Sequence, residues 1–128
     1  MTAFATLRLA AAASEAAPDG SAVCPLLRLP GASMVRFELA AGQCARAIVH
    51  RSIDEVWYVI SGHGELWRKQ ALREETVILE PGICVTIPAG THFQFRACAA
   101  APVAIIGVSV PGWPGDHEAM PVDGPWTP

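Results

Sequence analysis

The chain has 128 residues, 52% of them hydrophobic, which is enough for one domain with a substantial buried core. Its net charge is −3 and no stretch concentrates Lys and Arg, so we expect no nucleic-acid partner. No apolar stretch reaches the ~18–20 residues of a membrane span, and no positive charge precedes the apolar N-terminal run as in a signal peptide. We therefore expect no membrane association and a cytoplasmic location. The four cysteines, which form no C-x-x-C pair, are predicted to be mostly buried free thiols.

Short apolar runs alternate with glycine and proline turns along most of the chain. Residues 1–20 are predicted to form an N-terminal arm. Nine strands are predicted after it, at residues 23–29, 33–39, 46–50, 56–60, 65–68, 76–79, 83–87, 93–96 and 103–110. Short strands at this regular spacing predict an all-β barrel or sandwich over residues 21–110. Residues 111–128 are rich in proline and carry Trp113 and Trp126, so we expect an arm that packs back on the barrel.

Two segments carry a resemblance to a known family. Residues 42–62 fit the pattern G-x5-H-x-H-x(3,4)-E-x6-G, with His50 in the second histidine slot and Glu55 in the glutamate slot. Residues 82–97 fit the glycine and proline spacing of G-x5-P-x-G-x2-H-x3-N. With both frameworks intact, the chain resembles the small single-domain members of the cupin superfamily. The resemblance implies a double-stranded β-helix, or jelly-roll barrel, with a Pro-rich C-terminal arm, and it implies a homodimer.

The resemblance also bears on metal binding. Cupins that bind a metal use the three histidines and the glutamate of these motifs, whereas Ile48 and Phe93 occupy two of the histidine slots here. His92 stands one position before the Phe93 slot, and strand alternation points it away from the pocket. If a local bulge turned His92 inward, it would join His50 and Glu55 in a two-histidine, one-carboxylate site for a divalent metal such as Fe, Mn, Zn or Ni.

Strand alternation also predicts which side chains share a face of a strand. The resemblance implies that the faces turned toward the barrel interior carry Arg46, Ile48, His50, Glu55, Trp57, Phe93 and Phe95. We expect His50 and Glu55 to meet in the pocket, with the apolar members as its wall. Arg46 is either a partner for a substrate carboxylate near one mouth of the barrel or a surface charge at its rim.

Three functions fit such a pocket. In the first, a small-molecule enzyme uses His50 and Glu55 to exchange protons with a carbonyl- or enol-containing substrate, as in isomerisation, epimerisation or cyclisation. In the second, the protein binds a small ligand without turning it over. In the third, the site that includes His92 forms and supports metal-dependent oxygenase or lyase chemistry. The structural alternative for His50 and Glu55 is a buried hydrogen-bonded pair, but an ionised carboxylate rarely lies in a core without a partner.

Overall fold

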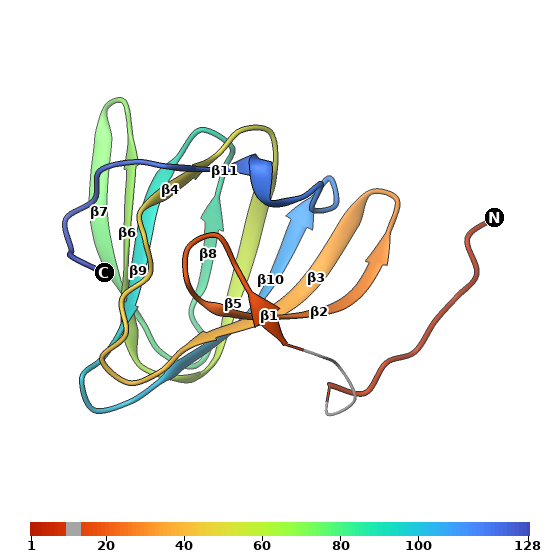
Figure 1. Cartoon of the computed structure of the whole chain (residues 1–128), viewed down its shortest axis with the longest axis horizontal. Coiled ribbons are helices and arrows are strands. Elements are labelled where there is room, and N and C mark those ends of the chain that lie inside the picture. The colour runs from red at the N-terminus through yellow and green to blue at the C-terminus, as the bar shows by residue number, and fades with distance from the viewer. Residues whose placement is uncertain (10–13) are drawn as a thin grey trace.

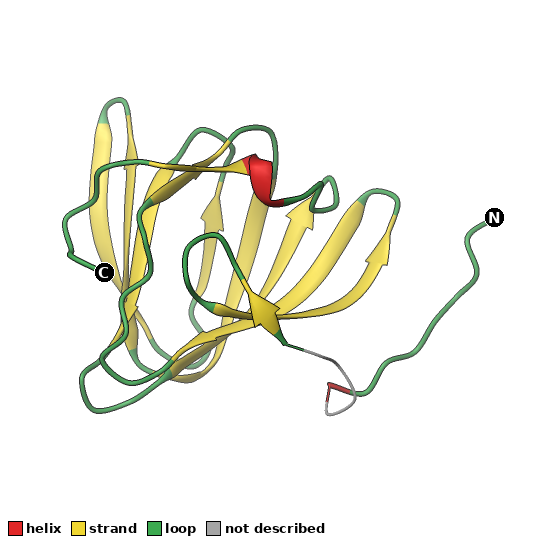
Figure 2. Cartoon of the chain, viewed as in Figure 1, coloured by secondary structure: helices red, strands yellow, loops and turns green. Residues whose placement is uncertain are grey.

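The computed structural model describes residues 1–9 and 14–128 and consists of two antiparallel sheets that face each other (Figures 1 and 2). The larger sheet has six strands in the order β1-β2-β3-β10-β5-β8, and the smaller has five in the order β11-β4-β9-β6-β7. The strands are β1 (Glu15–Ala16), β2 (Ala22–Leu29), β3 (Ala32–Leu39), β4 (Ile48–His50), β5 (Asp54–Gly62), β6 (Gly64–Gln70), β7 (Arg73–Leu79), β8 (Cys84–Ile87), β9 (His92–Ala97), β10 (Val103–Val110) and β11 (Ala119–Pro121). A short 3-10 turn, η2 (Asp116–Glu118), precedes β11. This all-β jelly roll is the fold that the sequence predicted.

All nine predicted strands are present as β2 to β10, with ends that move by a few residues. The difference that matters most is at β4, which begins at Ile48 and not at residue 46. Before it, Cys44 makes only an isolated bridge to Arg96. Two further strands were not predicted: β1 lies within the expected N-terminal arm and β11 within the expected C-terminal arm.

The inner faces of the two sheets meet in one hydrophobic core. At its centre, four aromatic rings pack edge to face. Phe37 and Trp57 have centroids 4.8 Å apart, Trp57 and Phe95 are 5.2 Å apart, and Trp57 and Phe93 are 5.7 Å apart. Each such pair contributes ~0.5–1.5 kcal/mol beyond the area that it buries. Because three of these four rings also line the cavity described below, the cluster gives that cavity a rigid apolar wall.

The turn between β5 and β6 shows why the first motif ends in glycine. Gly62 has a φ of 81°, and a Cβ at this position would lie 1.7 Å from the carbonyl oxygen of Pro102. Both the backbone conformation and the close approach of the segment before β10 exclude a side chain. The glycine therefore permits the tight return from the six-stranded sheet to the five-stranded sheet.

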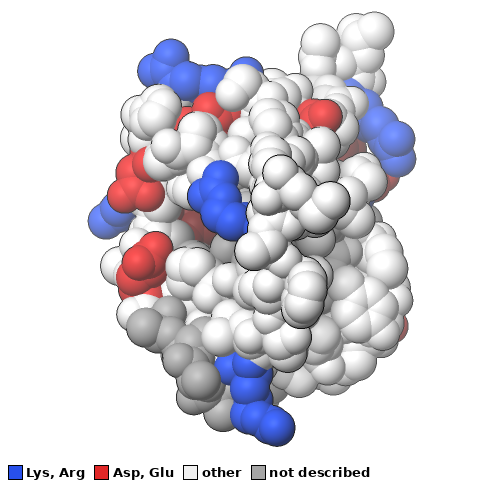
Figure 3. All heavy atoms as spheres, turned by 90° about the vertical axis from the view of Figure 1, so that its right-hand side faces the viewer, with Lys and Arg blue, Asp and Glu red and all other residues white. Residues whose placement is uncertain are grey.

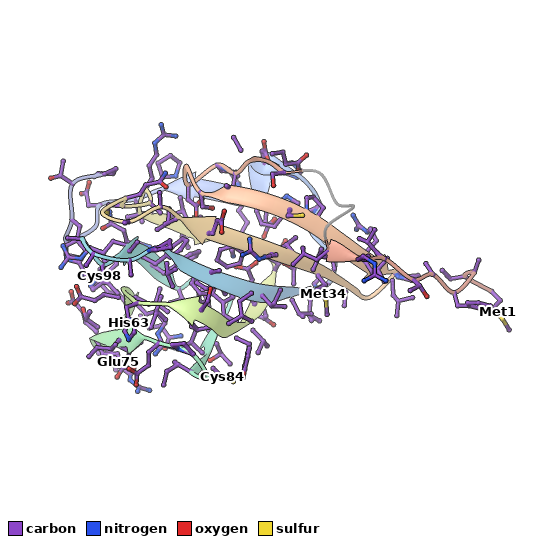
Figure 4. The ribbon with its side chains drawn as sticks, turned by 90° about the horizontal axis from the view of Figure 1, so that it is seen from below. Met1, Met34, His63, Glu75, Cys84 and Cys98 are labelled. Atoms are coloured by element: carbon purple, nitrogen blue, oxygen red, sulfur yellow. The ribbon has the colours of Figure 1, made fainter. Side chains whose placement is uncertain are left out.

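The surface carries charges of both signs. On the face drawn in Figure 3, Lys and Arg side chains stand apart from one another and form no continuous basic patch. No helix in residues 1–9 and 14–128 is long and apolar enough to cross a membrane. Only Cys24 is buried among the four cysteines; Cys84 and Cys98 are exposed at separate places in Figure 4, so the expectation of mostly buried thiols was wrong.

Candidate functional site

A cavity of about 270 Å³ opens into the barrel, close to the ~300 Å³ lower end of the usual range for small-molecule sites. Both sheets contribute to its wall, as do the turn before β2 and the segment between β10 and β11. The predicted residues that line it are Ile48, His50, Glu55, Trp57 and Phe93. The cavity therefore brings the predicted histidine and carboxyl together with three of the predicted apolar residues.

His50 ends β4 with its ring turned inward, and the residue is 3% exposed. The ring packs edge to face against Phe93 at 5.1 Å and Trp113 at 5.4 Å. Its Nδ1 is sealed from solvent and has no hydrogen-bond partner among the described residues, although buried polar atoms are normally paired. Burial lowers the pKa of His50 to about 4, an effect that the nearby Glu118 carboxylate opposes only in part. The imidazole is therefore neutral near pH 7.

Glu55 lies on β5 and faces His50 across the cavity wall, with its Oε1 3.6 Å from His50 Nδ1. The indole Nε1 of Trp57 donates a hydrogen bond to Oε1 (3.3 Å), and the hydroxyl of Ser109 donates one to Oε2 (3.0 Å). These bonds favour the carboxylate, but burial outweighs them and raises the pKa of Glu55 to about 7. The negative charge of the neighbouring Asp19 also raises the pKa of Glu55.

The two groups form a coupled acid–base pair. A separation of 3.6 Å is too long for a hydrogen bond, but catalytic contacts in unliganded sites often shorten when substrate binds. Between about pH 4 and about pH 7 the pair is a neutral imidazole beside a protonated carboxyl; above about pH 7 it is a neutral imidazole beside a carboxylate. Loss of that one proton converts the pair from an acid to a base.

The segment after β10 holds His50 in place. The carboxylate of Glu118 accepts hydrogen bonds from the backbone N–H groups of Ser52 and Ile53 and from the Ser52 hydroxyl. Burial alone would raise the pKa of Glu118, but these bonds outweigh it and lower the pKa. Next to Glu118, β11 pairs with β4 so that Ala119 stands opposite His50. The C-terminal arm thus closes over the residues that connect His50 to Glu55.

The far end of the arm also lies against the barrel. The side chain of Gln94 donates to the carbonyl of Trp126 (2.8 Å) and accepts from its backbone N–H (3.1 Å). The guanidinium of Arg96 lies 4.0 Å from the centre of the Trp126 ring. Nearer the site, the backbone N–H of Trp113 donates to the hydroxyl of Ser33 (2.9 Å), which fixes the ring that covers His50.

Two predicted members of the pocket are not in its wall. Arg46 precedes β4 in a segment without a ladder, so strand alternation does not apply to it, and its side chain is exposed. Its guanidinium donates to the carbonyl of Pro18 (3.4 Å). Of the two alternatives for Arg46, the structure therefore supports a surface charge at the rim of the barrel. Phe95 faces inward as predicted but is fully buried in the aromatic cluster, where it packs against Trp57 and does not reach the cavity.

The third predicted metal ligand, His92, does not join His50 and Glu55. His92 pairs in the ladder with Val49 and Lys69, and no bulge turns it toward His50 and Glu55. Within the described part of the chain, no group of three or more His, Cys, Asp or Glu side chains is placed to hold a metal ion. A catalytic metal usually needs three protein ligands, so the donors at this site do not fit one.

Residues that sequence reasoning missed are Asp19, Ser21, Ser109, Trp113 and Glu118. Ser109 is an inward position of β10, so alternation along that strand would have found it. Asp19, Trp113 and Glu118 reach the site from segments outside the ladders, where no periodicity exists to reveal them.

Residues 35–109, more than half of the chain, match the cupin domain family Cupin_2. The protein belongs to the cupin family. This cupin has no match among curated proteins. Its fold is similar to that of Pac13 from Streptomyces, a nucleoside dehydratase whose variants are seen in solved structures with uridine. The Pac13–uridine match has a TM-score of 0.74 at 17% identity and covers 95% of this chain and 92% of Pac13.

Two other solved structures have the same fold. KdgF from Halomonas sp. matches with a TM-score of 0.73 and 17% identity over 85% of this chain and 94% of KdgF. Oxalate decarboxylase from Bacillus subtilis matches with a TM-score of 0.78 and 12% identity over 95% of this chain and 33% of that larger protein. At these identities the likeness establishes the fold alone. The chemistry has to be argued from the residues that line the cavity.

Proposed function

We propose that this cupin is a small-molecule enzyme that moves a proton at a carbon next to a carbonyl group. Isomerisation, epimerisation and cyclisation of a carbonyl- or enol-containing substrate all begin with this step. The observation that carries the proposal is His50 Nδ1, which is buried without a hydrogen-bond partner and lies 3.6 Å from a carboxyl of raised pKa in the wall of a cavity. Buried titratable groups with such perturbed pKa values concentrate at functional sites.

In this proposal the base is the neutral imidazole of His50. Its Nε2 faces the substrate, and its Nδ1 faces the carboxyl of Glu55. Once Glu55 has lost its proton, Nδ1–H faces the carboxylate and the lone pair of Nε2 is free to accept a proton from the substrate carbon. The positive charge that forms on the ring is stabilised by Glu55, as in other histidine–carboxylate pairs. Return of the proton to a different atom, or to the opposite face of the same carbon, gives the isomer or epimer.

Trp57, Phe93 and Trp113 exclude water from the pair, because their rings surround His50 and Glu55. A dry site strengthens the interaction between imidazole and carboxyl. That Pac13 is a nucleoside dehydratase supports a small-molecule enzyme on this fold and carries no substrate over to this chain.

The test is exchange of substrate C–H for deuterium in D2O, followed by proton NMR with hydroxyacetone, dihydroxyacetone and cyclohexanone as probes. We expect the wild type to exchange the protons beside the carbonyl faster than buffer and His50→Gln to lose at least a hundredfold of that rate. The matched control is His63→Gln, at an exposed histidine outside the cavity. A wild type no faster than buffer with every probe, or a His50→Gln variant as fast as the wild type, contradicts the proposal.

The other function that a specific observation favours is binding of a ligand without turnover, since the cavity wall is largely apolar. In that case His50→Gln changes only the affinity for the probes, which line broadening of their proton resonances reports.

We also propose that the protein is a homodimer. The outer face of the six-stranded sheet exposes Val56, Tyr58 and Met34, with exposed fractions of 49%, 48% and 41%. Antiparallel sheets normally present polar residues on a solvated face, so an apolar one favours an interface. Val56→Lys should lower the molar mass measured by light scattering to that of a monomer, whereas Ile78→Lys, on the other sheet, should not. A wild type that is already monomeric contradicts this.

A further inference from the structure

A second cavity, of about 250 Å³, lies at the opposite edge of the six-stranded sheet from β1 and β2 (Figure 1). The hairpin of β6 and β7 forms one wall, and β8 with the turn of residues 88–91 forms the other. It shares no lining residue with the cavity of His50 and Glu55. Every side chain found in its wall except Pro88 is polar or charged, so this second cavity suits a polar ligand.

The wall of the second cavity has an excess of positive charge. Arg68, Lys69 and Arg73 are its cations, and Glu75 is its only acid among the described residues. The hydrogen bond and the charge of Arg73, with a smaller effect of Arg68, lower the pKa of Glu75, which is therefore a carboxylate near pH 7. The net charge of the wall is +2 (3 − 1).

The Glu75 carboxylate is already occupied by two arginines. Its Oε1 accepts from Nη2 of Arg68 (2.9 Å), and its Oε2 accepts from Nη2 of Arg73 (3.0 Å). Arg68 also donates from Nη1 to the carbonyl of Thr86 (2.9 Å), and its side chain is only 19% exposed. The side chain of Arg73 is 73% exposed, and its hydrogen bond within the described chain uses Nη2 alone. Arg73 therefore keeps N–H groups for a ligand.

The charge of Lys69 has no acid in contact with it. None of the ion pairs between described residues includes Lys69. Its partner in the ladder with β7 is Glu74, but that carboxylate accepts a hydrogen bond from the indole of Trp67 (2.8 Å). On the other side of Lys69 the ladder partner is His92, which is not an acid. Lys69 is thus a second cation available to a ligand.

The two walls of the cavity are fixed to each other before any ligand binds. The side chain of Gln70, at the end of β6, donates to the hydroxyl of Thr91 (3.0 Å), which is 2% exposed. The N–H of Thr91 in turn donates to the carbonyl of Pro88 (3.0 Å) and closes the turn. With the bond from Arg68 to Thr86, the hairpin is held to β8 and its turn at two points. A preformed site loses little conformational freedom on binding.

We propose that this cavity binds a phosphate group, which Arg73 and Lys69 contact while Arg68 supplies a fixed charge behind them. A phosphate monoester carries about −1.5 to −2 at pH 7, which matches the charge of the wall, whereas a carboxylate matches only half of it. Arginine and lysine are the usual phosphate-binding side chains. Holding the sheets together needs only Arg68 and its two acceptors, so that role leaves Lys69 and the unused N–H groups of Arg73 unexplained.

The proposal goes beyond the proposed function and does not depend on it. Two sources offer the same group: free phosphate and a small phosphorylated molecule. At about 250 Å³ the cavity is near the ~300 Å³ lower end of small-molecule sites, so both can enter.

The test is a two-dimensional proton–nitrogen NMR titration of the labelled protein with sodium phosphate and, separately, with glycerol 3-phosphate. Sodium chloride at the same ionic strength is the reference. We expect saturable shifts of the amides of residues 68–75 and 86–91 with both phosphates and not with chloride. Tighter binding of glycerol 3-phosphate assigns the site to a phosphorylated molecule, and tighter binding of phosphate assigns it to the free anion. Shifts that match those with chloride overturn the proposal.

Three variants separate a built site from general attraction of anions. Lys69→Gln and Arg73→Gln should each weaken phosphate binding roughly tenfold, because each loses a charge-assisted hydrogen bond. The matched control Arg8→Gln removes an exposed cation of the N-terminal arm and should bind within about twofold of the wild type, since salt screens distant charges. Thermal unfolding in chloride checks that each variant is folded.

Two results with these variants overturn the proposal: Lys69→Gln and Arg73→Gln that bind like the wild type, or an Arg8→Gln variant that is weakened as much as they are. Neither readout involves His50 or Glu55, so this proposal and the proposed function stand or fall separately.

Discussion

Replacement of Glu55 by glutamine tests whether burial keeps this carboxyl protonated in the folded protein. Its pKa is 4.5 in an unfolded chain and about 7 in the folded protein, a rise of about 2.5 pH units (7 − 4.5). Between those two values the folded state keeps a proton that the unfolded state has lost, so stability of the wild type falls as pH rises. At ~1.4 kcal/mol for each unit, the loss is about 3 kcal/mol. Glutamine has no such titration.

As pH rises from 4.5 to about 7, we therefore expect the free energy of unfolding of Glu55→Gln to rise by about 3 kcal/mol relative to that of the wild type. Above about pH 7 the difference should stay constant. Urea unfolding at a series of pH values measures this difference, in which the titrations of Asp19, His50 and Glu118 largely cancel. The matched control is Glu80→Gln, at an exposed carboxyl outside the cavity. A change of opposite sign in Glu55→Gln would refute the reasoning, because it would show a carboxylate paired with a protonated His50.

Three other predictions concern single side chains. The free energy of unfolding of His50→Gln should rise relative to that of the wild type as pH falls from 6.5 to about 4. Over that range the folded wild type keeps His50 neutral whereas its unfolded chain is protonated, so the wild type loses stability; urea unfolding checks it. Glu118→Gln should cost ~1–3 kcal/mol in the same assay, because Gln replaces one of the two acceptor oxygens, and NMR titration should show a further fall in the pKa of His50. Gly62→Ala should lower the free energy of unfolding by more than Gly42→Ala. Both positions have positive φ, which costs an alanine ~1–2 kcal/mol, but only at Gly62 would the added Cβ meet a backbone oxygen. Equal losses would contradict this.

The sequence predicted the fold because its turn residues are tied to fixed spacings. Gly62 has to be a glycine for a reason that is local and steric, and the same holds wherever a motif glycine adopts a positive φ. Glu55 and Trp57 were placed correctly because β5 is a regular strand, along which every second side chain faces inward.

The same reasoning failed where the backbone leaves the ladder. Arg46 was assigned to the pocket by extending the alternation of β4 two residues too far, into a segment that makes no strand. Asp19, in the cavity wall, and Glu118, bonded to the residues after His50, were missed because they lie in turns. The position of such turns depends on contacts across the whole chain, such as those of Glu118 with Ser52 and Ile53. Periodicity carries no information about such contacts.

The account depends above all on the protonation states of His50 and Glu55. They are measured directly by following the imidazole nitrogen and side-chain carboxyl carbon shifts of the isotope-labelled protein through a pH titration by NMR. At pH 6, between the pKa values of about 4 and about 7, we predict a neutral imidazole at His50 and a protonated carboxyl at Glu55. An imidazolium facing a carboxylate at that pH would contradict the central claim.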